Sequence, residues 1–172
     1  MLGCEKDEKM LMETITIINS YFFDFPKAQE CFKFYSHTFI QLHFFLVTFK
    51  DSKGPFIDMV LRILKNALIS GIVQAADFED QNIIEEFIPL MNSKVRISLV
   101  AKLLSLIAQR PHFKCQVTQH SEILTKILDV IINQSLVISD ECLENCLAAI
   151  AEVTHKSKEN TDILHSHSNA LA

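Results

Sequence analysis

Apolar residues recur every three or four positions along most of the chain, the spacing that places them on one side of an α-helix. Two stretches, 57–91 and 97–131, carry this pattern in register when one is shifted by forty positions. The aligned pairs are Ile57/Ile97, Val60/Val100, Ile63/Leu103, Leu64/Leu104, Ile83/Ile123, Ile84/Leu124, Phe87/Ile127 and Ile88/Leu128. A helical pattern that repeats about every forty residues is typical of stacked helical units. The pattern therefore predicts an all-α chain.

Residues that stop helices divide this pattern into six or seven elements. Gly54 and Pro55 form the clearest break, and Pro111 is expected to end a long helix. Ser139 and Asp140 are candidates to cap the last long helix. The predicted helices cover 5–21, 27–49, 56–76, 82–91, 94–110, 121–134 and 140–155, with a short piece at 112–119. The tail from 156 is polar, so we expect much of it to be loose, although a helix could begin at Thr161.

Composition agrees with short helices joined by short loops. The chain has 172 residues, of which 49% are hydrophobic and 22% charged, and it contains only three glycines and four prolines. This balance suits one globular domain rather than a disordered chain. No Gly-x-Ser-x-Gly elbow and no glycine-rich phosphate loop occurs. The sequence therefore predicts a protein that is not an enzyme, with no catalytic residues and no cofactor.

The segment 122–164 resembles an armadillo repeat. An apolar helix begins at Ile123, and a later helix, 142–153, carries small residues at Ala148, Ala149 and Ala151. The segment 83–109 is similar, and the resemblance covers about 56–164. It implies a right-handed superhelical stack of armadillo/HEAT-like repeats that binds other proteins. The chain departs from the family pattern in having six added residues between Gln134 and Glu141 and few glycines between helices.

Three regions follow from this resemblance. Residues 1–55 are predicted to form a Phe-rich helical cap, 56–164 the repeats, and 165–172 a flexible tail. Phe32, Phe39, Phe44 and Phe45 are expected to fill the core at the end of the array or, in part, to dock a partner. Since only two repeats and part of a third are clear, the chain is interpreted as a fragment or short form of a longer solenoid. Its exposed ends would allow self-association or a covering partner.

The charges are unevenly placed, although the net charge is only −5. No acidic residue occurs between Glu86 and Glu122, whereas five basic residues lie in the stretch 94–114. One interpretation is a solvated helix face; the other is a positive patch that fits an acidic segment of a partner. Asn145 is added because the resembling repeat places an asparagine on its groove helix. The predicted partner-binding residues are Arg96, Lys102, Arg110, Lys114 and Asn145.

The function predicted from these features is a non-catalytic interaction module or scaffold that binds a peptide or helix along a helical-repeat groove, within a larger assembly. The alternative is a nucleic-acid-associated repeat protein that uses the basic stretch 94–114. The net negative charge and the lack of aromatic interleaving suited to base stacking within the patch argue against nucleic acid.

Cysteine usage and the start of the chain bear on compartment and metal binding. His112, Cys115, Cys142 and Cys146 could be combined into a zinc site, but they lack tight paired spacings, so core cysteines and no metal are predicted. The charged residues 5–9 leave no apolar core for a signal peptide, and the apolar window 39–49 is too short to span a membrane. With five cysteines, these features predict a reducing compartment, the cytoplasm or nucleus.

Overall fold

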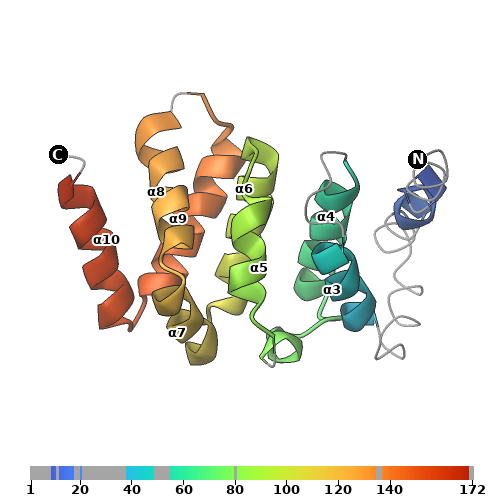
Figure 1. Cartoon of the computed structure of the whole chain (residues 1–172), viewed down its shortest axis with the longest axis horizontal. Helices are drawn as coiled ribbons and strands as arrows, with labels where there is room; N and C mark the ends of the chain where they lie inside the picture. The colour runs from blue at the N-terminus through green and yellow to red at the C-terminus, as the bar shows by residue number, and fades with distance from the viewer. Residues whose placement is uncertain are drawn as a thin grey trace. The chain divides into compact units, whose positions relative to one another are not determined.

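The computed structural model describes residues 9, 10, 12–17, 20, 38–48, 55–79, 81–134 and 137–170. Within these ranges the backbone forms α-helices, one 3₁₀ helix and turns, and no strand (Figure 1). The prediction of an all-α chain is therefore confirmed for the described residues. Among them, no helix combines the length and the apolar character needed to cross a lipid bilayer.

The helices fall into two compact units, Met1–Gln74 and Ala75–Ala172. The first contains α3 (Thr38–Thr48) and α4 (Phe56–Ile69). The second contains η1 (Ala75–Phe78), α5 (Ile83–Leu90), α6 (Lys94–Ile107), α7 (Pro111–Gln119), α8 (Glu122–Gln134), α9 (Asp140–Thr154) and α10 (Lys158–Ala170). The division of the chain at 55/56 and 164/165 stays a prediction.

In the first unit, α3 packs against α4 through apolar side chains. Leu42 and Leu46 are buried, and the ring of Phe45 meets that of Phe56 edge to face, with centroids 5.8 Å apart. Phe44 is exposed, which fits the expectation that not every phenylalanine of this helix is buried. Phe32 and the side chain of Phe39 lie outside the described part of the chain.

Helix α4 ends seven residues earlier than the sequence pattern predicts. Gly71 takes a φ of 72°, a left-handed conformation that glycine adopts without steric cost. Its N–H donates to the carbonyl of Leu68 at 3.1 Å, and the N–H of Ile72 donates to that of Ala67 at 2.9 Å. These bonds satisfy carbonyls that the helix end would leave unpaired. The apolar residues after Gly71 continue the periodic pattern and therefore concealed this end.

The second unit is organised by contacts between helices that occupy equivalent places in the chain. Helix α6 packs most extensively on α9, α5 packs on α8, and α7 packs on α10. Side-chain hydrogen bonds between distant residues of this unit connect positions 31 to 48 apart. Within the described part of this unit, α5, α6 and α7 therefore lie against α8, α9 and α10, respectively (Figure 1).

Two serines begin the central helices as caps. The hydroxyl of Ser93 accepts from the N–H of Arg96 at 3.3 Å at the start of α6. The hydroxyl of Ser139 accepts from the N–H of Cys142 at 3.2 Å at the start of α9, which confirms the predicted cap. A hydroxyl in this position satisfies one of the N–H groups that have no carbonyl within the helix.

Two boundaries in this unit differ from the sequence predictions. Helix α6 ends at Ile107, and Pro111 opens α7 in the first-turn position that tolerates its missing N–H. The tail expected to be loose forms α10 over thirteen residues. Its anchor is Asn160, a polar residue that is nevertheless fully buried between α7 and the end of α9. The polar composition of the tail gave no indication that Asn160 would be buried.

Candidate functional site

Helices α6 and α9 lie side by side in parallel. The thiol of Cys142 donates to the carbonyl of Lys94 at 3.8 Å, and the amide of Asn145 donates to the hydroxyl of Ser98 at 3.0 Å. From Lys94 to Ser98 along α6, the contacting residue on α9 changes from Cys142 to Asn145, so the two helices run in the same direction. The serine cap at the start of each helix therefore lies at the same end of the pair.

The solvent side of this pair is a shared surface, here called the α6–α9 face. Helical spacing and burial place Val95, Ser98 and Lys102 on it from α6. Helix α9 contributes Glu141, Glu144, Asn145, Ala148 and Glu152, all exposed or half-buried. Two of these residues, Ser98 and Ala148, have small side chains. The surface mixes apolar, amide and charged groups, as protein-binding surfaces do.

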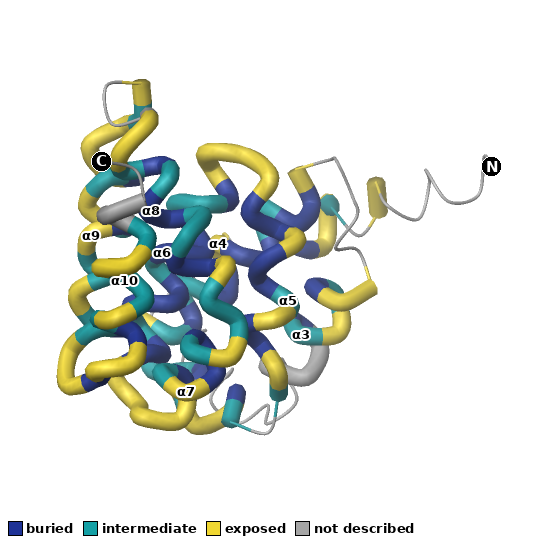
Figure 2. The backbone as a smooth tube through the Cα atoms, turned by 60° about the vertical axis from the view of Figure 1, so that its left-hand side comes forward, coloured by how far each residue is buried: buried dark blue, intermediate teal, exposed yellow. Residues whose placement is uncertain are grey.

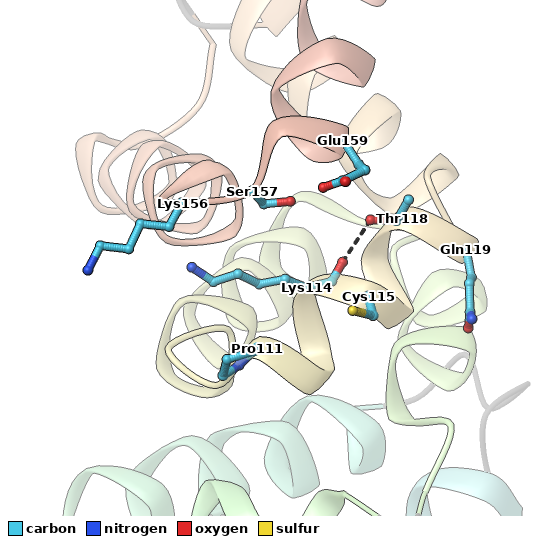
Figure 3. A pocket seen from close by; sticks show the side chains of 8 residues that line it. All are labelled: Pro111, Lys114, Cys115, Thr118, Gln119, Lys156, Ser157 and Glu159. Carbon is cyan, nitrogen blue, oxygen red and sulfur yellow. Dashed lines mark hydrogen bonds between the residues drawn. The ribbon is translucent and has the colours of Figure 1, made fainter.

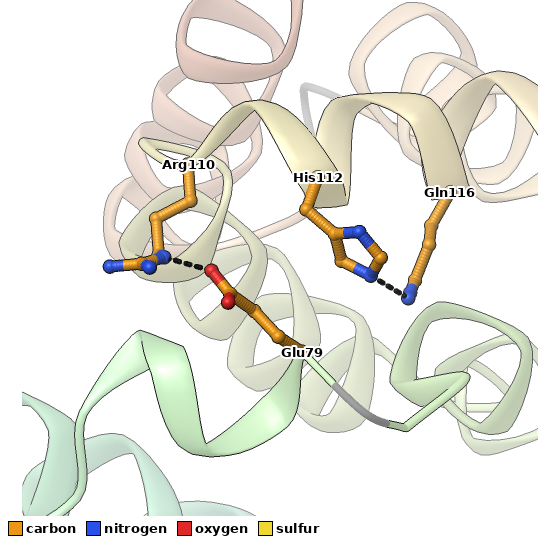
Figure 4. Close-up of polar contacts among 4 residues, drawn as sticks. All are labelled: Glu79, Arg110, His112 and Gln116. Carbon is orange, nitrogen blue, oxygen red and sulfur yellow. Dashed lines mark hydrogen bonds and ion pairs between the residues drawn. The ribbon is translucent and has the colours of Figure 1, made fainter.

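The structure does not place the predicted basic residues together on one free patch. Arg96 is only 4% exposed, and its guanidinium donates to the side-chain oxygen of Asn92 at 3.4 Å. Arg110 forms an ion pair with Glu79 (Figure 4). The ammonium of Lys114 donates to the carbonyl of His155, the C-cap of α9. These three cations are therefore engaged within the unit.

Lys102 and Asn145 are the two predicted residues that lie on the α6–α9 face. Lys102 is half-buried; the hydroxyl of Ser105 donates to its backbone carbonyl at 2.8 Å, and its ammonium forms no hydrogen bond or ion pair with another described residue. Asn145 contacts Ser98 from the neighbouring helix and so lies where the two helices meet. Of the basic stretch 94–114, this face offers chiefly the charge of Lys102.

Sequence reasoning missed the carboxylates of α9. This helix carries four acidic residues and no lysine, arginine or histidine. Three of the four are exposed, namely Asp140, Glu141 and Glu144, and Glu152 is half-buried. The signal is present in the segment 140–154, which contains four carboxylates and no basic residue. Helix α9 therefore presents negative charge along the surface that was expected to be positive.

A pocket of about 410 Å³ lies between α7 and the turn that leads into α10 (Figure 3). It is lined by Pro111, Lys114, Cys115, Thr118, Gln119, Lys156, Ser157 and Glu159. The hydroxyl of Thr118 at its wall donates to the carbonyl of Lys114 at 3.0 Å, within the same helix. Cations and one carboxylate meet here at the surface, but no group in the pocket is held by a base that could activate it. Most of its exposed lining comes from the apolar atoms of these side chains, so the pocket is a surface hollow without a converging set of polar groups.

On another side of α7, Gln116 is buried and joins α7 to the loop before α5. Its amide nitrogen lies 3.0 Å from the carbonyl of Gln81 and 2.9 Å from the Nε2 of His112 (Figure 4). Its amide oxygen has no hydrogen-bond partner among the described residues. The amide thus ties α7 to the loop before α5, beside the Arg110–Glu79 pair. We interpret this cluster as a structural link rather than a reactive site.

The cysteines of α9 behave as core residues. Cys142 and Cys146 are buried, one helical turn apart. Burial, reinforced by the neighbouring Cys142 thiol, raises the pKa of the Cys146 thiol to about 12 from its ordinary value of 9.0. A thiol with such a pKa is neutral at physiological pH and a poor nucleophile or metal ligand. Within the described residues, no three His, Cys, Asp or Glu side chains are grouped so as to hold a metal ion.

Thiol labelling provides a check on this assignment. At pH 8, iodoacetamide is expected to modify the exposed Cys115 and to leave Cys146 unmodified until the chain is unfolded. Peptide mass spectrometry locates the label. Equal labelling rates for the two cysteines in the folded chain would contradict the burial of Cys146.

The raised pKa of Cys146 also links stability to pH. Because the folded-state pKa is raised, the stabilisation linked to this thiol is complete below about pH 9 and is lost as the pH rises toward 12.

A scan against protein-family models and searches of curated proteins and of solved structures find no match to this chain.

Proposed function

We propose that the chain is a non-catalytic interaction module that holds a segment of another protein on the α6–α9 face. The observation that carries this proposal is the parallel contact of α6 and α9, which joins two helices about 46 residues apart into one surface. Such a surface can bind an extended peptide or a helix along its length. As part of this proposal, the module works within a larger assembly, as a scaffold.

The proposal includes an architecture of armadillo-like repeats. In it, α5–α6–α7 and α8–α9–α10 are consecutive units that form part of a right-handed superhelix. The pairwise packing of α5 on α8, α6 on α9 and α7 on α10 supports this, because equivalent helices of stacked repeats contact each other. The spacing of side-chain contacts supports it too. A bundle closed around one centre would bring its first and last helices together.

The charges of the face bear on the kind of partner. Lys102 lies in the middle of the surface and is suited to one carboxylate of a partner segment. The acidic groups Glu141, Glu144 and Glu152 lie on the α9 side of the face and are suited to cations of a partner. A partner segment of mixed charge fits this arrangement best. The nucleic-acid alternative is not favoured, because the carboxylates of α9 would repel a phosphate backbone.

Two substitutions on the face test the proposal. Ala148→Arg is expected to obstruct the surface, and Lys102→Glu to reverse its central charge; neither residue is fully buried, so the fold should be retained. The tagged chain and its variants are isolated from cells, and captured proteins are quantified by mass spectrometry. A partner that uses this face is expected to fall at least about tenfold in yield, since loss of a central interface residue costs more than about 1.4 kcal/mol.

Arg62→Glu is the matched control, because Arg62 is an exposed cation on α4 in the other unit. Capture of the same partner by this control, together with its loss from both face variants, would support the proposal. Unchanged capture by all three variants would show that the α6–α9 face binds nothing in the cell.

A further inference from the structure

Helix α9 has an apolar flank that faces away from α6. Leu143, Leu147 and Ile150 lie on one side of the helix at spacings of four and three residues. Asn145, which contacts α6, lies on the opposite side of the helix. Leu147 is 50% exposed, and Leu143 and Ile150 are half-buried. This row is here called the outer flank of α9.

The neighbouring helices leave the middle of the outer flank uncovered. Helix α10 reaches α9 at its last turn, where the amide of Asn160 donates to the carbonyl of Val153 at 3.3 Å. The outward side of α10 is polar, with Lys158, Glu159 and Asp162 exposed. Helix α10 thus packs on α7, α8 and the end of α9, whereas Leu147 in the middle of α9 stays exposed. Figure 2 shows exposed residues along the backbone of α9.

Charge beside this row distinguishes between the occupants that could cover it. The exposed carboxylate of Asp140 lies one turn before Leu143 and that of Glu144 one turn before Leu147, and α9 itself contains no lysine, arginine or histidine. A second copy of the chain docked by the same flank would bring two sets of these carboxylates, and no cation of α9, into one interface. Like charges brought together in an interface cost several kcal/mol. A partner with cations beside its apolar residues would pair with them instead.

We infer that the outer flank of α9 is a docking site for a basic amphipathic helix of a partner protein. Its apolar side packs on Leu143, Leu147 and Ile150, and its lysines or arginines meet Asp140 and Glu144. The apolar contacts supply most of the affinity, and the charges set orientation and speed of encounter. The inference requires only the fold of α9 within its unit; the site shares Glu144 with the α6–α9 face but needs no partner bound there.

A pair of synthetic helices tests this inference. One fluorescein-labelled peptide carries leucines along one face and lysines on the other, and its counterpart has glutamates in place of the lysines. Fluorescence anisotropy measures their binding to the full chain at low and at physiological salt. The lysine peptide is expected to bind at least about tenfold more tightly than the glutamate peptide, with the difference reduced by salt. Equal binding of the two peptides would overturn the inference.

Variants locate the binding. Leu147→Ser is expected to weaken the lysine peptide about fivefold or more, and Glu144→Lys to weaken it while strengthening the glutamate peptide. Ile69→Ser, which removes a similarly exposed apolar residue (58%) from α4, should leave both affinities unchanged. Circular dichroism confirms that each variant keeps its helicity. The inference would be overturned if neither Leu147→Ser nor Glu144→Lys weakened binding of the lysine peptide. It would also be overturned if light scattering showed a dimer that Leu147→Ser dissociates.

Discussion

Replacing Phe113 by alanine is expected to lower the free energy of unfolding by about 4 kcal/mol. The side chain is fully buried, and its ring meets that of His112 edge to face at 5.4 Å. Helix α7 has only nine residues and would not be stable alone. Its position therefore depends on the residues it buries. Phe113→Ala truncates the largest of these side chains and leaves a cavity.

Chemical denaturation monitored by circular dichroism measures this loss. Ile132→Ala, at an apolar residue on α8 that is 46% exposed, is the matched control and should cost well under half as much. Hydrogen exchange should show that α7 and α10 lose protection together in the Phe113→Ala variant, because the two helices pack on each other. A loss below about 1 kcal/mol would mean that Phe113 is not packed as described.

Asn160→Ala is expected to lower the free energy of unfolding by about 3 kcal/mol. Its fully buried amide donates to the carbonyls of Lys114 and Val153 at 3.0 and 3.3 Å and accepts from the hydroxyl of Thr118 at 3.0 Å. Alanine would leave these groups without their partner in a site that water does not reach. Such unpaired polar groups cost more than the net strength of the bonds they replace.

Asn145→Ala is the comparison for this variant. Asn145 is half-buried, and the one side-chain bond found for it joins Ser98, so the expected loss is about 1 kcal/mol or less. Thermal unfolding of both variants gives the ranking. If Asn160→Ala were no more destabilising than Asn145→Ala, Asn160 would not be the anchor of α10.

Most of the helices could be predicted because each one keeps the three- to four-residue spacing of apolar residues within its own segment. The pattern predicted α5, α6, α8 and α9 to within a few residues, and Ser139 marked the start of α9. The end of α4 was predicted seven residues too late, and α10 was foreseen only as a helix that could begin at Thr161. Gly71 ends α4 through its left-handed conformation, and Asn160 holds α10 through bonds to residues up to 46 positions away. Apolar periodicity contains neither kind of information.

The candidate site was harder to predict because whether a charged side chain is paired or available depends on residues far away in the sequence. Arg110 and Glu79 are 31 residues apart, and Lys114 is satisfied by a backbone carbonyl 41 residues away. Arg96 follows a polar cap, and its burial results from the side of α6 on which it falls. The sequence therefore showed where cations are concentrated but not which remain available. The acidic character of α9, by contrast, could have been read directly.

Distances between spin labels on α6 and α9 test the parallel pairing on which the face depends. Labels replace the exposed Val95 near the start of α6 and, in separate samples, Glu141 near the start or Ala151 near the end of α9. The latter two positions lie about 15 Å apart along the helix axis. Double electron–electron resonance should give a clearly shorter distance for Val95–Glu141 than for Val95–Ala151. Equal distances, or the reverse order, would contradict the parallel α6–α9 contact.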